Sequence, residues 1–202
     1  MVYFVNSGCR AGNEVRMSRN LIDLMVEEHK YIKRMLVVTR KYCYRVMKNQ
    51  PVKYEDFYKI IDFVRNYADR HHHGKEEKLL FESMMKELGR PAEMLVRHGM
   101  LVEHDLGRLH MQELETALKK VMEGDDEARL DVIANAISYT HLLHRHIDKE
   151  DSVVYTFARR NLDRETQARL DAEGEVLEQE AEAQQVQQKY IQLLSELEDG
   201  LT

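Results

Sequence analysis

Residues 71–81 read HHHGKEEKLLF, so three histidines and two glutamates lead directly into an apolar run. Side chains four residues apart on a helix leave the same face, one turn from each other. His73 and Glu77 have this spacing, and so do His72 and Glu76. Counting back from the apolar run at helical periodicity places His73 and Glu77 on the apolar stripe and Glu76 toward its edge or the solvent. We therefore expect His73 and Glu77 to point into the core.

The same spacing recurs later in the chain. The segment HRHIDKED contains His146 and Glu150 four residues apart, and Asp151 follows as a rival carboxylate. Two further segments, EEHK and VEHD, each place one histidine among apolar residues, and these are His29 and His104. Each of four helices thus directs one histidine toward the interior.

Four inward histidines and two inward carboxylates would be costly to bury without a cation that neutralises their charge. Carboxylates can bridge two metal ions, and imidazole with carboxylate suits iron or manganese better than structural zinc or copper(I). The sequence therefore predicts a metal centre. Its expected ligands are His29, His73, Glu77, His104, His146 and Glu150.

The elements that must position these ligands are long helices. Only 2 prolines and 9 glycines interrupt the chain and Trp is absent, which is typical of an all-α protein. Four helices of this length with short joints predict an antiparallel up-down four-helix bundle over residues 18–162, preceded by a loosely ordered segment 1–17. Apolar periodicity and chain breakers give the approximate helix bounds as 18–48, 54–88, 98–123 and 126–162.

Residues 163–202 form a C-terminal extension of different character. From Asp163 onward the chain has 11 acidic residues against 3 basic ones, yet Tyr190, Leu194 and Leu197 keep helical apolar spacing. We expect an additional acidic C-terminal helix that packs only in part. Its apolar stripe finds a partner either on the flank of the bundle or in another subunit, which leaves a homodimer through this helix as one option.

Several functional classes are disfavoured by composition. The formal net charge is -6 and no basic stripe is evident, which argues against a nucleic-acid partner. No apolar stretch approaches the roughly 20 residues that span a bilayer, and no cleavable signal pattern is evident. The 2 cysteines are too few for a disulfide framework. These features favour a cytoplasmic protein.

The ordered set EEHK, HHHGKEEKLLF, GMLVEHDLGR and HRHIDKED resembles the hemerythrin-like, or HHE cation-binding, domain. The resemblance covers about residues 18–162 and implies two non-haem iron ions bridged by Glu77 and Glu150. It places the other ligands in two pairs, His29 with His73 and His104 with His146.

One position departs from the pattern of the oxygen-carrying members of that family. They have a second histidine one turn before the residue that matches His104, and this chain has Met100 there. The missing ligand could be His98 if the helix is irregular at this point, or His72, Glu76 or solvent.

The resemblance implies that the chain binds iron and reacts with, or senses, dioxygen, peroxide or nitric oxide. A reversible oxygen carrier, an enzyme of peroxidase or oxidase type, and an iron-responsive regulatory or storage module remain open at this point. No separate catalytic residues are indicated.

Overall fold

The computed structural model describes residues 19–201, and every regular element in that range is helical. The predicted all-α class is therefore confirmed, whereas the prediction for segment 1–17 lies outside the described residues. The α-helices are α1 (Leu21–Met47), α2 (Glu55–Phe63), α3 (Glu82–Leu88), α4 (Arg90–Leu95), α5 (Leu101–Met122), α6 (Arg129–Lys149), α7 (Tyr155–Asn161), α8 (Arg164–Ala183) and α9 (Val186–Asp199). The π-helical segments are η1 (Val64–His73), η2 (Glu76–Phe81), η3 (Val96–Met100) and η4 (Glu150–Val154).

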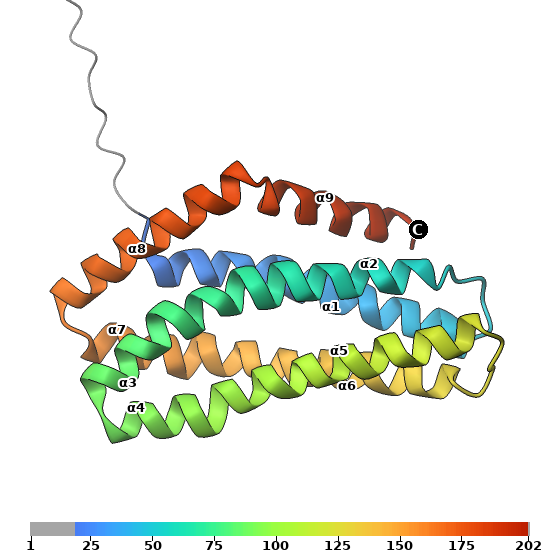
Figure 1. Cartoon of the computed structure of the whole chain (residues 1–202), viewed down its shortest axis with the longest axis horizontal. Helices are drawn as coiled ribbons and strands as arrows, with labels where there is room; N and C mark the ends of the chain where they lie inside the picture. Colours follow the sequence, from blue (N-terminus) through green and yellow to red (C-terminus); the bar gives the residue numbers. More distant parts are fainter. Residues whose placement is uncertain (1–18, 202) are drawn as a thin grey trace, which may run out of the picture.

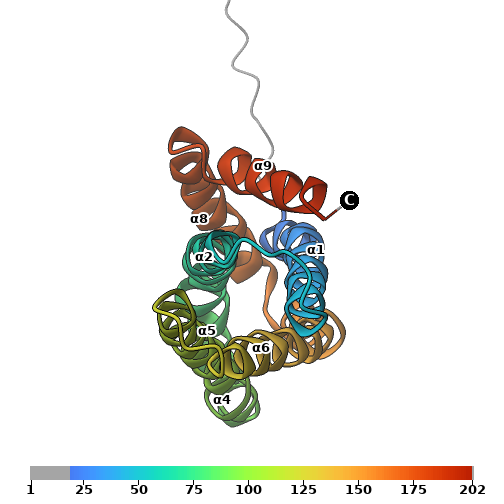
Figure 2. The ribbon, with the colours of Figure 1, turned by 90° about the vertical axis from the view of Figure 1, so that its right-hand side faces the viewer.

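The long helical stretches lie side by side along the long axis of the molecule (Figure 1), and the end view shows them around a shared interior (Figure 2). These stretches are α1, α2 to α3, α4 to α5, and α6 to α7. Gly89 and Gly124 end two of them with φ of 64° and 102°, where a residue with a Cβ would be strained.

Two predicted helix starts differ from the structure. The first helix, α1, begins at Leu21 rather than near residue 18, and the side chain of Asn20 caps it by accepting a hydrogen bond from the backbone N–H of Asp23. The third long stretch begins at Arg90 and not near residue 98, because Pro91 occupies the first turn of α4, where its missing N–H costs nothing.

Within residues 19–201, π-helical segments interrupt three of the four long stretches. His72 and His73 end η1, Glu76 begins η2, and Glu150 begins η4. A π-helix closes i→i+5 hydrogen bonds and so places roughly one residue more in each turn than an α-helix, and such segments are frequent at functional sites. They change which side chains face the interior.

Two clusters of buried apolar side chains fill the interior on either side of a belt of buried polar residues. Along α1, Met25 belongs to one cluster and Ile32 to the other, and the buried His29 lies between them. The same order holds along the third stretch, where the buried His104 follows Met100 of one cluster and precedes Met111 of the other. The apolar clusters therefore fix the helices on both sides of the polar belt.

The C-terminal extension forms two helices, α8 and α9, rather than the single helix expected. The chain turns between them at Gln185, which has a left-handed φ of 55°. Tyr190, Leu194 and Leu197 of α9 are buried in the same apolar cluster as α1 and α2, so their partner is the flank of the bundle. None of the described helices is long and apolar enough to cross a membrane.

The middle of α8 packs closely on the start of α1. A Cβ on Gly174 would lie 2.8 Å from Leu21 Cδ1, so the Leu21 side chain would have to move to admit it. Asp171 accepts a hydrogen bond from the backbone N–H of Leu21 at 2.8 Å and satisfies one free donor at the first turn of α1. The extension is thus part of the packed structure.

Candidate metal centre

The buried polar belt contains two groups of side chains with converging ligand atoms. In each group, one ligand atom per residue lies within 4.8 Å of the others. Both groups contain Glu76, and their histidines differ. The first group is His73, Glu76, His104 and His146, and the second is His29, His72, Glu76 and Glu150.

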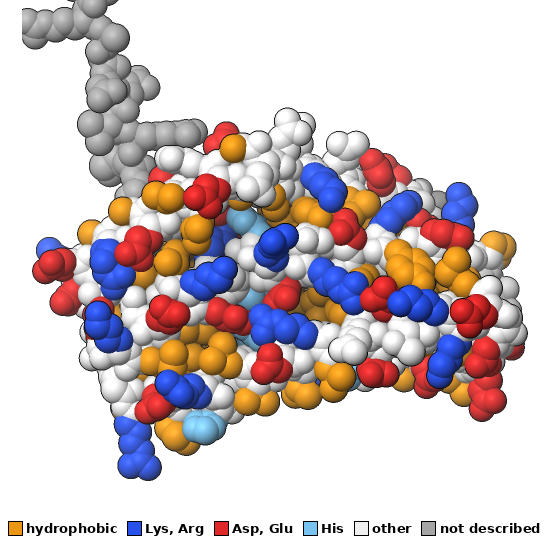
Figure 3. Space-filling model, in the orientation of Figure 1, with side chains coloured by type: hydrophobic (Ala, Val, Ile, Leu, Met, Phe, Trp, Pro, Cys, Tyr) orange, Lys and Arg blue, Asp and Glu red, His pale blue; other side chains and the backbone are white. Residues whose placement is uncertain are grey.

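These ligand atoms are shielded from solvent. His146, Glu76 and Glu150 are 0% exposed, and the other four histidines are also buried. On the face shown in Figure 3, histidine surface is visible only in small areas, among intermixed basic and acidic side chains. The centre is therefore enclosed by the helices that supply its side chains.

Two carboxylates lie between the groups. Glu76 Oε2 is 3.5 Å from His104 Nε2 and 3.8 Å from His72 Nε2. Glu150 Oε1 lies 2.9 Å from His146 Nε2, while its Oε2 lies 3.4 Å from His29 Nε2. Each carboxylate can thus contact cations held by either group, which is the arrangement of a bridging ligand.

Every histidine of the two groups has an outer carboxylate partner at Nδ1. The five pairs and their N···O distances are His29–Asp151 at 2.7 Å, His72–Glu28 at 2.7 Å, His73–Asp69 at 3.3 Å, His104–Glu77 at 2.7 Å and His146–Glu103 at 2.9 Å. A carboxylate behind a histidine fixes the ring orientation and raises its basicity toward a metal. This pattern across five side chains is typical of a metal site.

The outer carboxylates also determine where the imidazole hydrogens lie. Burial favours the neutral acids, yet hydrogen bonds from the imidazoles and nearby cations hold the pKa of all five outer carboxyls below their ordinary values. An ionised carboxylate only accepts hydrogen bonds, so Nδ1 of each ring carries the donated hydrogen. In a neutral ring, Nε2 then presents a lone pair to the interior.

The inward atoms lack the partners that buried polar atoms normally have. His29 Nε2, His72 Nε2, Glu76 Oε2 and both oxygens of Glu150 are buried and make no hydrogen bond. Orphaned polar atoms of this kind are rare and costly in folded proteins. Cations between the groups would satisfy them, so the residues present fit a pair of metal ions.

Two side chains of the belt, His146 and Glu76, have pKa values above their ordinary ranges. Burial lowers the pKa of His146, but Glu150 and Glu103 outweigh burial and raise it to about 9. Burial, together with the neighbouring Glu150, raises the pKa of Glu76 well above its ordinary value. Both shifts favour the protonated form in the metal-free protein, and bound metal ions would replace those protons.

Two other histidines favour the neutral form that a metal requires. Burial and the nearby His29 lower the pKa of His72 to about 4. Burial and the stacked ring of His104, 3.8 Å away between centroids, lower the pKa of His73 well below its ordinary value. Both rings are thus available as neutral imidazole ligands for a metal ion at neutral pH.

Tyr155 orients one of the shared carboxylates. Its hydroxyl donates to Glu76 Oε1 at 2.6 Å, which leaves Oε2 directed between the two groups. The ring also stacks on His29 with 5.7 Å between centroids. Tyr155 therefore contacts both the bridge and one ligand of the second group.

A cavity of about 280 Å³ opens beside the first group. It reaches His73 and His104, and apolar parts of Met111, Tyr139 and Leu143 contribute to its walls. This volume suits a small molecule rather than a large organic substrate. The cavity gives such a molecule a path toward the buried belt.

Five of the six predicted ligands lie in the two groups, and Glu77 does not. Glu77 is partly exposed, with its Oε1 bound to His104 Nδ1 and, at 2.7 Å, to Arg108. The prediction that Glu76 lies toward the solvent is wrong, since Glu76 is 0% exposed. The count from the apolar run assumed an α-helix, whereas π-helical η2 begins at Glu76 and shifts the inward face by one residue.

The grouping of the histidines also differs from the one implied by the resemblance. His73 lies with His104 and His146, and His72 takes the place beside His29. The first group therefore contains three imidazoles, although Met100 occupies the position one turn before His104 where the oxygen carriers have a histidine. His98 is exposed and is not in either group. Of the two rival carboxylates, Glu150 lies between the groups and Asp151 lies behind His29.

Sequence reasoning missed the outer carboxylates. Glu28 precedes His29 and Glu103 precedes His104, yet each supports a histidine of another helix, His72 and His146. Spacing along one helix carries no signal for such a pair. Only Asp69, four residues before His73, has a spacing that could have indicated its role.

Comparison with known proteins agrees with this geometry. A family model described as the hemerythrin HHE cation binding domain matches residues 20–158, which is more than half of the chain. Searches of curated proteins and of solved structures gave no match. The buried histidines and carboxylates described above all lie within the matched residues. The chain therefore belongs to the hemerythrin HHE cation-binding domain family.

Proposed function

We propose that this protein is a non-haem di-iron protein whose helices form an antiparallel up-down four-helix bundle around two iron ions. His73, His104 and His146 would hold one ion, and His29 and His72 the other. Glu76 and Glu150 would bridge them, so Glu76 replaces Glu77 in the ligand set expected from the sequence.

The observation that carries this proposal is the shared position of the two buried carboxylates. Two cations a few ångströms apart repel each other unless anionic ligands lie between them. Glu76 and Glu150 have oxygens near Nε2 atoms of both groups, and three of these four oxygens lack any hydrogen bond. Imidazole and carboxylate together suit iron or manganese, and of these two metals iron is the one that the family resemblance implies.

We further propose that the centre reacts with, or senses, dioxygen, peroxide or nitric oxide. Two iron ions held in this way would supply electrons to a small oxidant or a binding position for it. The chain itself contributes an enclosed belt between two apolar clusters and a cavity of about 280 Å³ beside His73 and His104. Ordered outer carboxylates keep each imidazole in one orientation while the ligand arrives.

The second candidate is an iron-responsive regulatory module. The observation that favours it is a buried set of charged side chains that joins the C-terminal helix α8 to Glu28, the carboxylate behind His72. In such a module, iron occupancy would change how α8 and α9 are held, rather than driving repeated turnover.

The test is metal content and reactivity of untagged protein, loaded with Fe(II) without oxygen. We expect two ions per chain by elemental analysis and uptake of dioxygen on exposure to air, followed by absorption spectroscopy. A folded preparation that saturates at one ion, or binds none, would overturn the di-iron proposal. Two bound ions with no reaction toward dioxygen, peroxide or nitric oxide would favour the regulatory candidate.

A further inference from the structure

A second set of buried charged side chains lies outside the two metal-ligand groups. We refer to Glu28, His71, Lys75 and Glu178 as the outer charge cluster. Lys75 is 1% exposed, Glu178 2% and Glu28 3%, although charged side chains are rarely buried to this extent. The cluster joins three parts of the chain, namely α1, the stretch from η1 to η2, and α8.

The Lys75 ammonium lies at the centre of the cluster. It donates to Glu28 Oε1 and to Glu178 Oε1 at 2.5 Å, and it lies 3.2 Å from His71 Nε2. His71 Nε2 also lies 2.9 Å from Glu28 Oε1. Two carboxylates from different helices thus share one ammonium group in an interior position.

The cluster contacts the metal-ligand group directly. Glu28 uses its other oxygen, Oε2, to accept a hydrogen bond from Nδ1 of His72 at 2.7 Å. The same carboxylate therefore holds a proposed metal ligand with one oxygen and Lys75 with the other. On the far side, Gln187 of α9 donates to Glu178 Oε2, which extends the connection to the second C-terminal helix.

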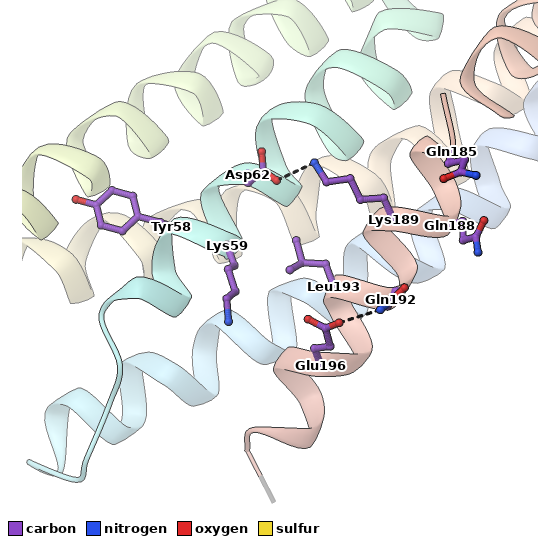
Figure 4. Close-up of a pocket in the computed structure, with 9 residues that line it drawn as sticks. All are labelled: Tyr58, Lys59, Asp62, Gln185, Gln188, Lys189, Gln192, Leu193 and Glu196. Atoms are coloured by element: carbon purple, nitrogen blue, oxygen red, sulfur yellow. Dashed lines mark hydrogen bonds and ion pairs between the residues drawn. The ribbon is translucent and has the colours of Figure 1, made fainter. Parts of the chain in front are cut away.

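The remaining contacts of α9 are of a different kind. Tyr190, Leu194 and Leu197 pack into the apolar cluster and belong to neither metal-ligand group. At the edge of α9 a groove of about 540 Å³ faces α2 and is lined mostly by polar side chains, with Lys189 and Asp62 paired across it at 3.5 Å (Figure 4). Exposed pairs of this type contribute little to stability and are screened by salt.

Removing one partner from a buried charged cluster is far more disruptive than breaking an exposed pair, because the remaining charges are left uncompensated. A cation at His72 Nε2 would polarise the ring and strengthen the hydrogen bond from Nδ1 to Glu28. Glu28 would then stay in the orientation that keeps Lys75 between it and Glu178. Conversely, detachment of α8 would leave Glu28 as the remaining carboxylate partner of Lys75 within the cluster and weaken the support of His72.

We propose that Glu178 and Lys75 are positioning residues for His72, so that docking of α8 and α9 and metal binding at the His29–His72 group stabilise each other. This proposal rests on the metal centre proposed above. Since coupling between two equilibria is reciprocal, the factor by which docking raises metal affinity equals the factor by which metal favours docking.

The first experiment needs no substitution. Hydrogen exchange of the α8 backbone amides is measured by mass spectrometry in the full chain, metal-free and after anaerobic loading with Fe(II). We expect exchange in α8 near Glu178 to slow about tenfold on loading, the size typical of outer partners of metal ligands. Equal exchange in the two states, with two ions bound, would overturn the proposal.

The second experiment compares Glu178→Gln with Glu198→Gln. Glu198 of α9 also pairs with a cation of α1, the Arg34 guanidinium at 2.6 Å, but its side chain is 35% exposed and contacts neither metal-ligand group. In Fe(II) titrations, Glu178→Gln should weaken one of the two binding steps about tenfold and leave the other unchanged. Glu198→Gln should leave both steps unchanged.

Whether Glu178→Gln weakens the binding of one ion or of both distinguishes a positioning role for Glu178 from a general effect on folding. Loss of both ions to an equal degree in Glu178→Gln would indicate only a structural role and would overturn the proposal, as would unchanged affinity for both. If Glu178→Gln does not fold, the hydrogen-exchange comparison in the unchanged chain decides. Failure of the unchanged chain to bind two ions would instead count against the proposed di-iron function.

Discussion

Replacing Glu76 and Glu77 by glutamine, one at a time, tests which of two neighbouring carboxylates belongs to the metal centre. Each substitution keeps the size of the side chain and replaces an ionisable carboxyl group with a neutral amide. Glu76 Oε2 lies 3.5 Å from His104 Nε2, inside the belt, whereas Glu77 Oε1 lies 2.7 Å from the opposite nitrogen of that ring. The two variants therefore act from opposite sides of the same imidazole.

The expected magnitudes differ by more than tenfold in metal affinity. Loss of an outer partner costs about 10–100-fold, and Glu77→Gln should fall at or below the lower end because its amide oxygen still accepts from His104. Glu76→Gln removes a bridging anion shared by both groups, so we expect a loss above about 100-fold, or about 2.7 kcal/mol, and release of at least one ion.

Thermal unfolding of Glu76→Gln gives a second test, because the substitution should affect the stability of the metal-free and metal-loaded forms differently. Because burial and the neighbouring Glu150 raise the pKa of Glu76 well above its ordinary value, the neutral acid is the favoured form in the metal-free protein. Glutamine matches that neutral form, so the metal-free stability should change by less than about 1 kcal/mol. The metal-loaded stability should fall by about 1.4 kcal/mol for each tenfold loss of affinity.

The assay is anaerobic Fe(II) titration with elemental analysis, followed by thermal unfolding of the metal-free and loaded forms. Two retained ions in Glu76→Gln, together with loss of an ion in Glu77→Gln, would refute the π-helical register and restore the ligand set expected from the sequence.

Three further outcomes are expected. Tyr155→Phe removes the hydroxyl that donates to Glu76 Oε1, so iron affinity should fall about tenfold while the metal-free fold is kept, as circular dichroism would show; unchanged affinity would argue against an orienting role. Arg108→Ala removes a half-exposed guanidinium that holds two of the outer carboxylates, so iron affinity should fall less than tenfold, and the difference from the unchanged chain should shrink as salt rises in a titration series. Burial raises the pKa of Cys43 to about 12, so in a Cys9→Ser variant its reaction with a disulfide reagent at pH 8 should be slow until denaturant is added, and rapid reaction of the native protein would contradict its burial.

Much of the helical architecture follows from local sequence. Apolar spacing and a low content of glycine and proline are properties of short segments, and they predicted the all-α class and the approximate helix bounds. The pair His146 and Glu150 was also accessible, because η4 begins only at Glu150 and the preceding helix α6 is regular. The i, i+4 rule holds where the helix between two side chains is an α-helix.

The sequence did not reveal which side chains of the second long stretch, α2 to α3, face the interior. The residues around Glu76 have ordinary helical spacing in the sequence, and nothing in their types marks η1 and η2 as π-helical. A π-helix is tolerated there because side chains from other helices, such as Tyr155 and Glu28, hold Glu76 and His72 in place. Local propensity cannot include those partners.

The amino-acid sequence by itself determined that histidines and carboxylates would be buried in a helical protein, because both apolar periodicity and ligand spacing are encoded within single helices. Only the tertiary structure decided which nitrogen faces which carboxylate, since the rotation and axial offset between helices depend on how side chains of all of them pack together. That is why His72 and His73 joined different groups, and why Lys75 came to lie between Glu28 and the distant Glu178.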